Sequence, residues 1–554
     1  IPTISVEHAA DVIFHGGVVL TMDESLSVAQ ALAIKGDKII AVGSDSDVFA
    51  FAGVETEMIA LEGQTLMPGF VDAHTHILND ASHYGMDMDG IQQMALENGI
   101  TTFANLFTSQ DFLNEMRDYN TENKLRVRTS LYLIYNTNCG DIVGNWWKAH
   151  PPTRDPGEML RIGGVKMFAD GGSCNRPALS YETSPGSGLG DLYLTGDQIA
   201  EVVKEAQEVG HQVAIHALGD RAIEAALDGL EFALAGGPNI NRHRIEHNAI
   251  LRPDLLPRYG ELDVVATIFG TFPSCIDFKN PSPPPYNEWE WAWDTLLDAN
   301  PELHVAWHGD DPYIAPLNPI LELYGLVTRN YADDDRVTVC EGKDWIVDNT
   351  LTVEQALPMM NRESAYALFR DGEVGMLEPG MFADLIILSH NPMSDDPNTL
   401  LDTYVLMTMV GGKVEWCASG SETLCSSTEA TETETVFFDS DSVPFGYIDV
   451  PALDETISGI YQVSGWALVD GGPIDRVEIY LDGEYIGNAV YGSPRPDVAT
   501  DYPGRDGEPN FGYSFELDTT LYGNGPHMLS VVAFSLSGNE GYLIPDTLNF
   551  TIDN

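Results

Sequence analysis

Residues 67–76, MPGFVDAHTH, guide the interpretation of the whole chain, because they place two histidines at the C-terminal end of an apolar strand. Side chains at positions i and i+2 of a strand point to the same side, so His74 and His76 face one spot. Imidazole is a favoured ligand of borderline divalent metals such as zinc. A pair of histidines in a solvated turn is the alternative that this motif leaves open by itself.

From residue 68 to residue 370, short apolar runs alternate with helical segments such as GDQIAEVVKEAQEVG, which begins at Gly196. Alternation over about 300 residues is typical of α/β folds, either a TIM-like (β/α)8 barrel or a doubly wound sheet. The active site of such a barrel lies at the carboxyl ends of its strands. We therefore expect a barrel over 68–370, with both histidines at its mouth.

Four more side chains end later strand-like runs, namely Lys166, His216, His247 and Asp310. Each has an ordinary structural explanation. The lysine could reach solvent or pair with Asp170, the two histidines could be core residues bonded to backbone, and the aspartate could be a helix N-cap or a turn carboxylate. Six candidates at the ends of five strands indicate instead that they share one metal site.

Strand-like sequence flanks the barrel segment on both sides. Residues 1–67 and 371–416 are expected to form the two parts of one small composite β-sandwich. Residues 417–443 include SSTEATETETVFFDSDS, an acidic Ser/Thr/Glu segment that is typical of a flexible linker. From 444 to 554, short alternating strands with Gly, Asp and Asn turns predict a separate all-β, immunoglobulin-like sandwich.

The charge of the chain argues against two classes of partner. Its 554 residues carry 85 Asp and Glu against 27 Lys and Arg, a formal net charge of −58. Such a surface repels phosphate backbones and anionic lipid, so we expect neither nucleic-acid binding nor membrane-surface binding. No apolar run approaches the roughly 20 residues needed to span a bilayer. The expected exterior is strongly solvated.

Six cysteines are too few for a disulfide scaffold in a chain of this length. Five of them, taken singly, are expected to be ordinary buried thiols: Cys139, Cys174, Cys275, Cys340 and Cys417. Cys417 and Cys425, however, close the short polar loop CASGSETLC, in which a disulfide is sterically easy. Both interpretations of this pair stay open. A bridge would indicate an oxidising compartment, and we expect a secreted or cell-surface protein.

Together these motifs resemble the metal-dependent amidohydrolase superfamily. MPGFVDAHTH and GMLEPGMFADLIIL look like its opening and closing segments. VKMFADGGS, IHALGDRAI and RIEHNAI are similar to its N-substituted formamide deformylase-like branch. The resemblance covers residues 11–413, and it implies both the TIM-like barrel and the small composite β-sandwich.

The resemblance also implies a site for two divalent metal ions, which we expect to be zinc. By the family pattern, one ion would be held by His74, His76 and Asp310. The other would be held by His216 and His247.

Lys166, carbamylated by carbon dioxide, would bridge the two ions. A hydroxide held between the metals would attack the carbonyl of a small amide-type substrate. Asp310 would take the proton of the hydroxide and pass it to the leaving nitrogen. The implied reaction is hydrolysis of a C–N bond, in a linear amide rather than a peptide.

Three features depart from that branch. The segment that follows His76 is short, and His308 occupies a position where a small residue is usual. The sequence TIFGTFPS, from Thr267, brings two phenylalanines to the mouth of the barrel. These differences predict a more open and more aromatic mouth. The candidate substrate contacts are Arg176, Phe269, Phe272 and His308.

Other functions stay open on the same residues. A cyclic-amide hydrolase, a deaminase or a dipeptidase would use the same metal ligands, and a substrate panel would separate them. A non-catalytic cell-surface binding protein is the alternative from another class, although a decayed site would be expected to lose at least one of the six ligands. The C-terminal domain is expected to act as a spacer or to attach weakly to a surface polymer.

Overall fold

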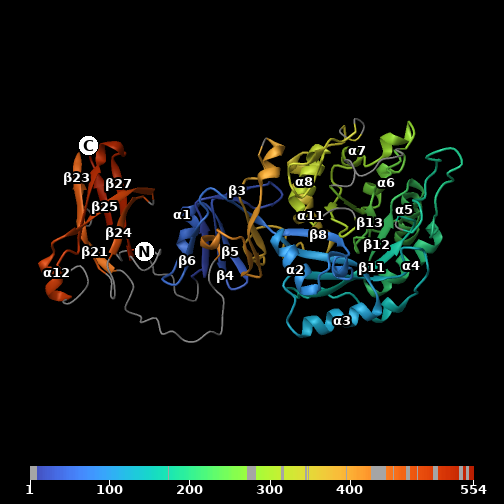
Figure 1. The fold of residues 1–554 in the computed structure, drawn as a ribbon, viewed down its shortest axis with the longest axis horizontal. Coiled ribbons are helices and arrows are strands. Elements are labelled where there is room, and N and C mark those ends of the chain that lie inside the picture. Colours follow the sequence, from blue (N-terminus) through green and yellow to red (C-terminus); the bar gives the residue numbers. More distant parts are fainter. Residues whose placement is uncertain are drawn as a thin grey trace. The chain divides into compact units, whose positions relative to one another are not determined.

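The computed structural model divides the chain into two compact units, Ile1–Glu429 and Ala430–Asn554 (Figure 1). Each has its own apolar core. The described residues are 9–172, 174–270, 282–313, 317–343, 346, 348–394, 396–425, 445–452, 455–468, 474–482, 484–502, 509–535, 541–543 and 548–554. Residues 426–443 of the expected linker lie outside these ranges.

Eight parallel strands form one sheet, in which each strand pairs with the next along the chain. They are β8 (Phe70–Thr75), β9 (Ile100–Thr108), β10 (Arg128–Ile134), β11 (Leu160–Phe168), β12 (Gln212–Ala217), β13 (Arg244–His247), β14 (Val265–Ile268) and β15 (Val305–Trp307). The last strand reaches the first just beyond their ends, because the amide of Asp310 donates to the carbonyl of His74 at 3.0 Å. The amide of His76 likewise donates to the carbonyl of Asp311 at 2.8 Å. The sheet is therefore a near-barrel of the TIM-like type that the sequence predicted.

Helices follow the strands and cover the outside of the barrel (Figure 1). They are α2 (Met88–Glu97), α3 (Gln110–Thr121), α4 (Gly196–Val209), α5 (Asp220–Leu234), α6 (Leu256–Glu261), α7 (Trp293–Ala299), α8 (Pro319–Thr328), α10 (Val353–Met359) and α11 (Arg362–Ala367). The helix α4 buries one stripe of apolar side chains at helical spacing, namely Ile199, Val202, Val203 and Ala206. A capping box of Thr195 and Gln198 starts α4, and Gly210, with a φ of 86°, ends it. None of the helices within the described ranges is long and apolar enough to cross a membrane.

Two further sheets are built from the segments that flank the barrel. The first, in the order β5-β4-β1-β6, comes from the N-terminal flank alone. The second, β20-β19-β18-β7-β2-β3, combines strands from both flanks. The strands are β1 (Val12–His15), β2 (Val18–Leu20), β3 (Val28–Ala29), β4 (Ala31–Lys35), β5 (Lys38–Gly43), β6 (Glu57–Ala60), β7 (Thr65–Pro68), β18 (Leu385–Leu388), β19 (Val405–Val410) and β20 (Lys413–Cys417). Leu385 and Ile387 belong to the core between these sheets, whereas Ile386 and Leu388 pack with the barrel core. Both faces of β18 are therefore buried, which explains its continuous apolar sequence LIIL.

Smaller elements complete the first unit. They are the one-turn helix α1 (Asp45–Val48) and the short strands β16 (Tyr331–Ala332) and β17 (Val339–Cys340).

Disulfides correct the expectation that most cysteines are ordinary buried thiols. Cys139 and Cys174 are joined, with their Cα atoms 5.2 Å apart, and both residues are exposed. Cys340 is disulfide-bonded as well, and Cys275 lies outside the described residues. The first pair is separated by 35 positions in sequence, so no local pattern reveals it, and only the barrel brings the two loops together.

The bridge between Cys417 and Cys425 is present, which decides between the two interpretations of that pair. It extends the packed part of the first unit beyond β20, because Leu424 is buried in the core between the two flanking sheets. The described part of this unit therefore continues to Cys425, and the predicted start of the linker at residue 417 stays a prediction.

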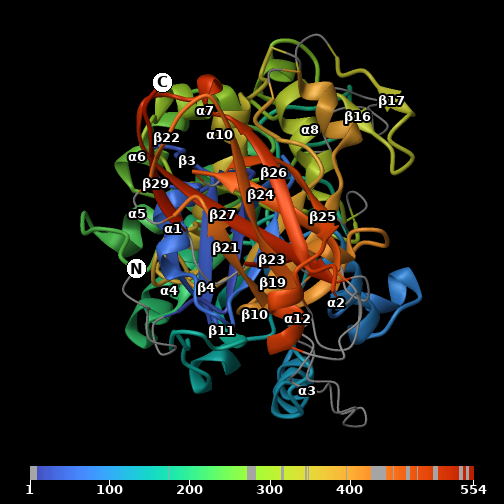
Figure 2. The same ribbon diagram turned by 90° about the vertical axis from the view of Figure 1, so that its left-hand side faces the viewer.

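The described part of the second unit consists mainly of strands (Figure 2, orange to red). They form a path in the order β21-β23-β26-β25-β24-β27-β29-β22, with β28 beside β27. The elements are β21 (Phe445–Val450), β22 (Thr456–Ile457), β23 (Ile460–Leu468), β24 (Ile474–Leu481), β25 (Glu484–Ser493), α12 (Pro496–Asp501), β26 (Gly512–Asp518), β27 (Gly525–Ser535), β28 (Gly541–Leu543) and β29 (Leu548–Ile552). The first part of β25 pairs with β24 and its last part pairs with β26. Both halves of the path supply one core, for instance Val463 and Val477, so the predicted all-β unit is confirmed.

His243 is a buried titratable group at the end of the barrel opposite the histidine-rich mouth. The amide of Val213 donates to its Nδ1 at 3.0 Å, and burial lowers the pKa of His243 from its usual 6.5 to about 3. Below about 6.5 the unfolded chain therefore binds a proton that the folded chain does not. The contribution of this residue to stability is complete above that pH and is lost as the pH falls toward 3.

We expect the variant His243→Asn to melt at a lower temperature than the wild type near pH 7.5, because the bond to the Val213 amide is weakened. The gap in Tm should shrink near pH 5, since protonation of the unfolded wild type costs it up to about 1.4 kcal/mol per pH unit. Thermal unfolding followed by circular dichroism at both pH values measures this. His390→Asn, at an exposed histidine, is the control. A gap that widens on acidification would contradict the assignment.

Candidate metal centre

All six side chains predicted to bind metal meet at the carboxyl ends of the barrel strands. They are His74, His76, Lys166, His216, His247 and Asp310. The carboxylate of Asp310 is central, with Oδ1 3.3 Å from Nε2 of His74 and 3.2 Å from Nε2 of His76. Its Oδ2 lies 3.9 Å from Nδ1 of His247. The ring of His216 lies 4.6 Å from the ring of His247, measured between centroids.

Lys166 is completely buried in β11, which excludes a side chain that reaches solvent. Its Nζ lies 3.2 Å from Nε2 of His74. Asp170, the other suggested partner, accepts hydrogen bonds from three backbone amides. Burial lowers the pKa of Lys166 to about 8, although the charges of Glu246 and Asp310 oppose this. The lysine is thus partly neutral near physiological pH.

The backbone at two of these residues is unusual. His247 has a φ of 74° and Asp310 has a φ of 54°, in the left-handed region that non-glycine residues seldom occupy. Such conformations persist where the surrounding structure holds them, and they are concentrated at functional sites. Burial by itself would raise the pKa of Asp310, but the hydrogen bond and charge of His76, with the charges of His308 and Lys166, bring it below its ordinary value. Asp310 is therefore an ionised carboxylate at neutral pH.

The donor set fits a divalent cation. Burial, with neighbouring positive charges, lowers the pKa of His74 and of His247 well below the ordinary value, and lowers that of His216 to about 3. Neutral imidazole is the form that binds metal. Among the described residues, Nε2 of His216 and Nδ1 of His247 have no hydrogen-bond partner, although buried polar atoms are nearly always paired. An ion would satisfy them.

Glu246 is a residue of this centre that the motifs did not reveal. Its Oε2 accepts a hydrogen bond from Nδ1 of His74 at 2.7 Å and another from the hydroxyl of Thr267 at 3.1 Å. Its Oε1 lies 3.0 Å from Nε of Arg244. A carboxylate in this position fixes the ring and leaves Nε2 of the histidine free for a metal. The sequence RIEH at residues 244–247 could have indicated it, because Arg244 and Glu246 carry opposite charges and lie on the same side of a buried strand.

Asp72 joins the beginning of the barrel to its end. Its Oδ1 accepts from the amide of His74 at 2.9 Å and from the amide of Gly309 at 3.2 Å. A Cβ at Gly309 would lie 2.2 Å from Oδ2 of Asp311, so a larger residue there would displace the side chain of Asp311. The two hydrogen bonds of Asp72 therefore hold His74 close to Asp310, the residue after Gly309.

The structure brings two of the four candidate substrate contacts to the cluster. Phe269 and His308 are buried, with ring centroids 5.2 Å apart. Arg176 is exposed, and its guanidinium donates to the carbonyl of Ser187. Phe272 lies outside the described residues. Contact of these side chains with a substrate stays a prediction.

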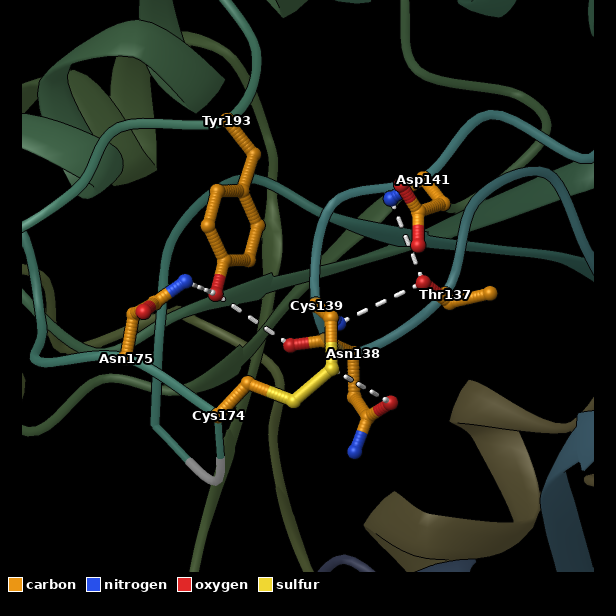
Figure 3. Close-up of a disulfide and its surroundings, with 7 residues drawn as sticks. All are labelled: Thr137, Asn138, Cys139, Asp141, Cys174, Asn175 and Tyr193. Carbon is orange, nitrogen blue, oxygen red and sulfur yellow. Dashed lines mark hydrogen bonds between the residues drawn. A yellow bond between two sulfur atoms is a disulfide. The ribbon is translucent and has the colours of Figure 1, made fainter.

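The disulfide between Cys139 and Cys174 joins the loop after β10 to the loop after β11 (Figure 3). The hydroxyl of Tyr193 donates to the carbonyl of Asn138 at 3.3 Å in the same place. Gly172, two positions before Cys174, lies against the centre, since a Cβ there would be 3.2 Å from Cε1 of His216. The bridge therefore restrains a loop that borders the site.

The role of Glu246 can be tested on metal affinity. We expect Glu246→Gln to weaken metal binding by roughly 10–100-fold, because an amide holds the ring of His74 less firmly. Titration of the metal-free protein with zinc in competition with a chromogenic chelator measures the affinity. Glu373→Gln, which changes a carboxylate paired with Arg161 away from the cluster, is the matched control. Equal affinities of Glu246→Gln and the wild type would refute the role.

Known proteins resemble this chain in sequence and in fold. N-substituted formamide deformylase of Arthrobacter pascens is 36% identical over 274 residues, 48% of this chain and 47% of that protein. Protein LONG AFTER FAR-RED 3 of Arabidopsis thaliana is 27% identical over 429 residues, 71% of this chain and 68% of that protein. The chain thus spans about half the length of the first relative and about two thirds of the second.

Solved structures share the fold. An uncharacterized metal-dependent hydrolase from Pyrococcus horikoshii superposes with a TM-score of 0.60 at 19% identity, over 70% of this chain and 99% of that chain. Atrazine chlorohydrolase TrzN from Arthrobacter aurescens, complexed with zinc, superposes with a TM-score of 0.50 at 15% identity, over 73% and 94%. A model of the amidohydrolase family matches residues 88–415, well over half of the sequence. The barrel, its cluster of donors and this match agree, and the chain belongs to the amidohydrolase family.

Proposed function

We propose that this protein is a binuclear metal-dependent amidohydrolase that hydrolyses a C–N bond, other than a peptide bond, in a small linear amide. The convergence of four imidazoles and a lysine around Asp310 supports it most directly. The proposed ligands are His74, His76 and Asp310 for one ion, His216 and His247 for the other, and carbamylated Lys166 between them. When bound, two zinc ions would lower the pKa of a water molecule and polarise the substrate carbonyl.

Lys166 supplies the proposed bridging anion. Its lowered pKa leaves part of the amine neutral near physiological pH. The neutral amine forms a bond from Nζ to the carbon of carbon dioxide and releases one proton, which leaves a carbamate. This reaction converts a buried cation beside His74 into an anion. The unfavourable burial of an unpaired ammonium among imidazoles is thereby relieved.

Asp310 acts as the proposed proton carrier. Its carboxylate is ionised at neutral pH, so it can accept a proton from the attacking water. It then donates that proton to the nitrogen of the leaving amine, which departs neutral. The left-handed backbone at Asp310 and its amide bond to the carbonyl of His74 hold the carboxylate in place for both transfers.

A linear amide is favoured by the partial likeness to N-substituted formamide deformylase. The test is turnover by the zinc-loaded full chain of N-substituted formamides and N-acyl amines, beside cyclic amides, dipeptides and aminopurines. Release of amine from the linear amides supports the proposal. Turnover confined to one of the other classes replaces it with a cyclic-amide hydrolase, a dipeptidase or a deaminase. A full metal complement with no turnover anywhere would favour the non-catalytic binding protein.

Substitution of Asp310 tests the proton carrier. Asp310→Asn keeps the shape and one oxygen but cannot accept the proton, so kcat should fall by about 10²–10⁴-fold. Asp311→Asn is the control. Burial, with the charges of Asp72, Glu322 and Asp310, raises the pKa of Asp311 well above its ordinary value, and Asp311 is not one of the proposed metal ligands. Steady-state kinetics and the metal content of both variants are measured. Equal losses of kcat in the two variants would contradict the assignment of Asp310 as the proton carrier.

We also propose that the protein is secreted or held at the cell surface, and that residues 444–554 form an immunoglobulin-like sandwich that spaces the enzyme or attaches weakly to a surface polymer. The bridges Cys139–Cys174 and Cys417–Cys425 support an oxidising compartment. Alkylation of free thiols in protein taken from its native cells, read by mass spectrometry, should find both bridges oxidised. Free thiols at these positions would contradict the location. Co-sedimentation of the full chain with cell-wall polymer tests the attachment.

A further inference from the structure

His308 is a buried histidine without a hydrogen-bond partner among the described residues, and it lies beside the proposed metal ligands. Its imidazole is completely buried directly after β15. Neither of its ring nitrogens has a hydrogen-bond partner within the part of the chain that the structure describes. Buried polar atoms are nearly always paired, because an unpaired one forfeits its bond to water. His211 also has two such nitrogens, so it is the position of His308 among the proposed metal ligands that points to a ligand outside the described residues.

The neighbours of His308 are other imidazoles. Its ring stacks on that of His74, with centroids 5.0 Å apart and planes inclined by 29°. It lies 4.9 Å from the ring of His247. One ligand atom of each of these three residues lies within 4.8 Å of the other two. Imidazoles at this spacing are a ligand set for a borderline divalent metal.

His74 has only one nitrogen to offer. Its Nδ1 is bonded to Glu246 at 2.7 Å. Its Nε2 lies 3.3 Å from Nε2 of His76 and 3.3 Å from Oδ1 of Asp310, which places it in the first set of ligands. The two remaining members of the imidazole group, His247 and His308, are then left for the second ion.

We propose that His308 is an additional metal ligand, which joins His247 on the second ion while His74 stays with His76 and Asp310. The proposal rests on the proposed function, because it adds a donor to the same binuclear centre. A further nitrogen makes the second position richer in imidazole than a pair of histidines would be. Nitrogen-rich sites favour zinc or cobalt over the hard ions magnesium and calcium.

Cobalt(II) is the probe for the test, since its visible absorption depends on the number and type of its ligands. The full chain, freed of metal with a chelator, is titrated with cobalt in bicarbonate buffer, and bound metal is counted by elemental analysis. His308→Phe keeps a buried ring and removes both nitrogens. His308→Gly leaves room for free imidazole. His211→Phe is the matched control, because His211 is equally buried and packs on Trp147 at the opposite end of β12.

We expect His308→Phe to bind one of the two cobalt ions at least about 10-fold more weakly and with an altered spectrum, while the other ion binds as in the wild type. Added imidazole should restore the second ion and its spectrum in His308→Gly. His211→Phe should titrate like the wild type. A role limited to stacking on His74 would not give this rescue.

Wild-type affinity and spectrum in His308→Phe would overturn the proposal and leave the proposed function intact. Failure of imidazole to restore the second ion in His308→Gly would also overturn it, and this variant carries the test if His308→Phe does not fold. A wild-type chain that takes up no cobalt would overturn the proposed function and, with it, this inference.

Discussion

The candidate metal centre depends on the contact between the first and last barrel strands. Asp72, at the first strand, accepts the amide of Gly309, which lies 237 positions later in the chain. Two backbone bonds, from Asp310 to His74 and from His76 to Asp311, continue the contact. Without them, the histidine pair and the central carboxylate would belong to separate edges of an open sheet. The donors can therefore assemble only when the ring of strands is complete.

The interior that supports this contact is costly in free energy. Lys166, Arg244 and Glu246 are completely buried, and removing such charges from water is repaid only in part by their mutual attraction. Apolar contacts between strands and helices and between the two flanking sheets stabilise the unit, and smaller apolar clusters such as the one around Val71 and Tyr132 add to them. The barrel thus separates two tasks. Its apolar clusters supply stability, and the carboxyl ends of its strands hold charged groups in positions that a metal centre requires.

The loops that follow the barrel strands border the candidate metal centre. The disulfide at Cys139 and Cys174 restrains the border of the centre near His216, and Phe269 and His308 lie against the imidazoles. The strand ends supply the donors, whereas these loops decide what can approach them. The donors alone therefore do not identify the substrate.

The sequence by itself determined the barrel, the β-structure built from its two flanks, the all-β C-terminal unit and the six side chains that meet at the mouth of the barrel. These follow from local rules, because the period of two in a strand and the strand-end position of an active site can be read within about ten residues. Only the tertiary structure decided that Glu246 orients His74 across 172 positions, that Cys139 pairs with Cys174, and that the ring of His308 lies among imidazoles with both nitrogens unpaired. Each of these contacts joins residues that share no strand or helix, and the closure of the barrel creates their proximity.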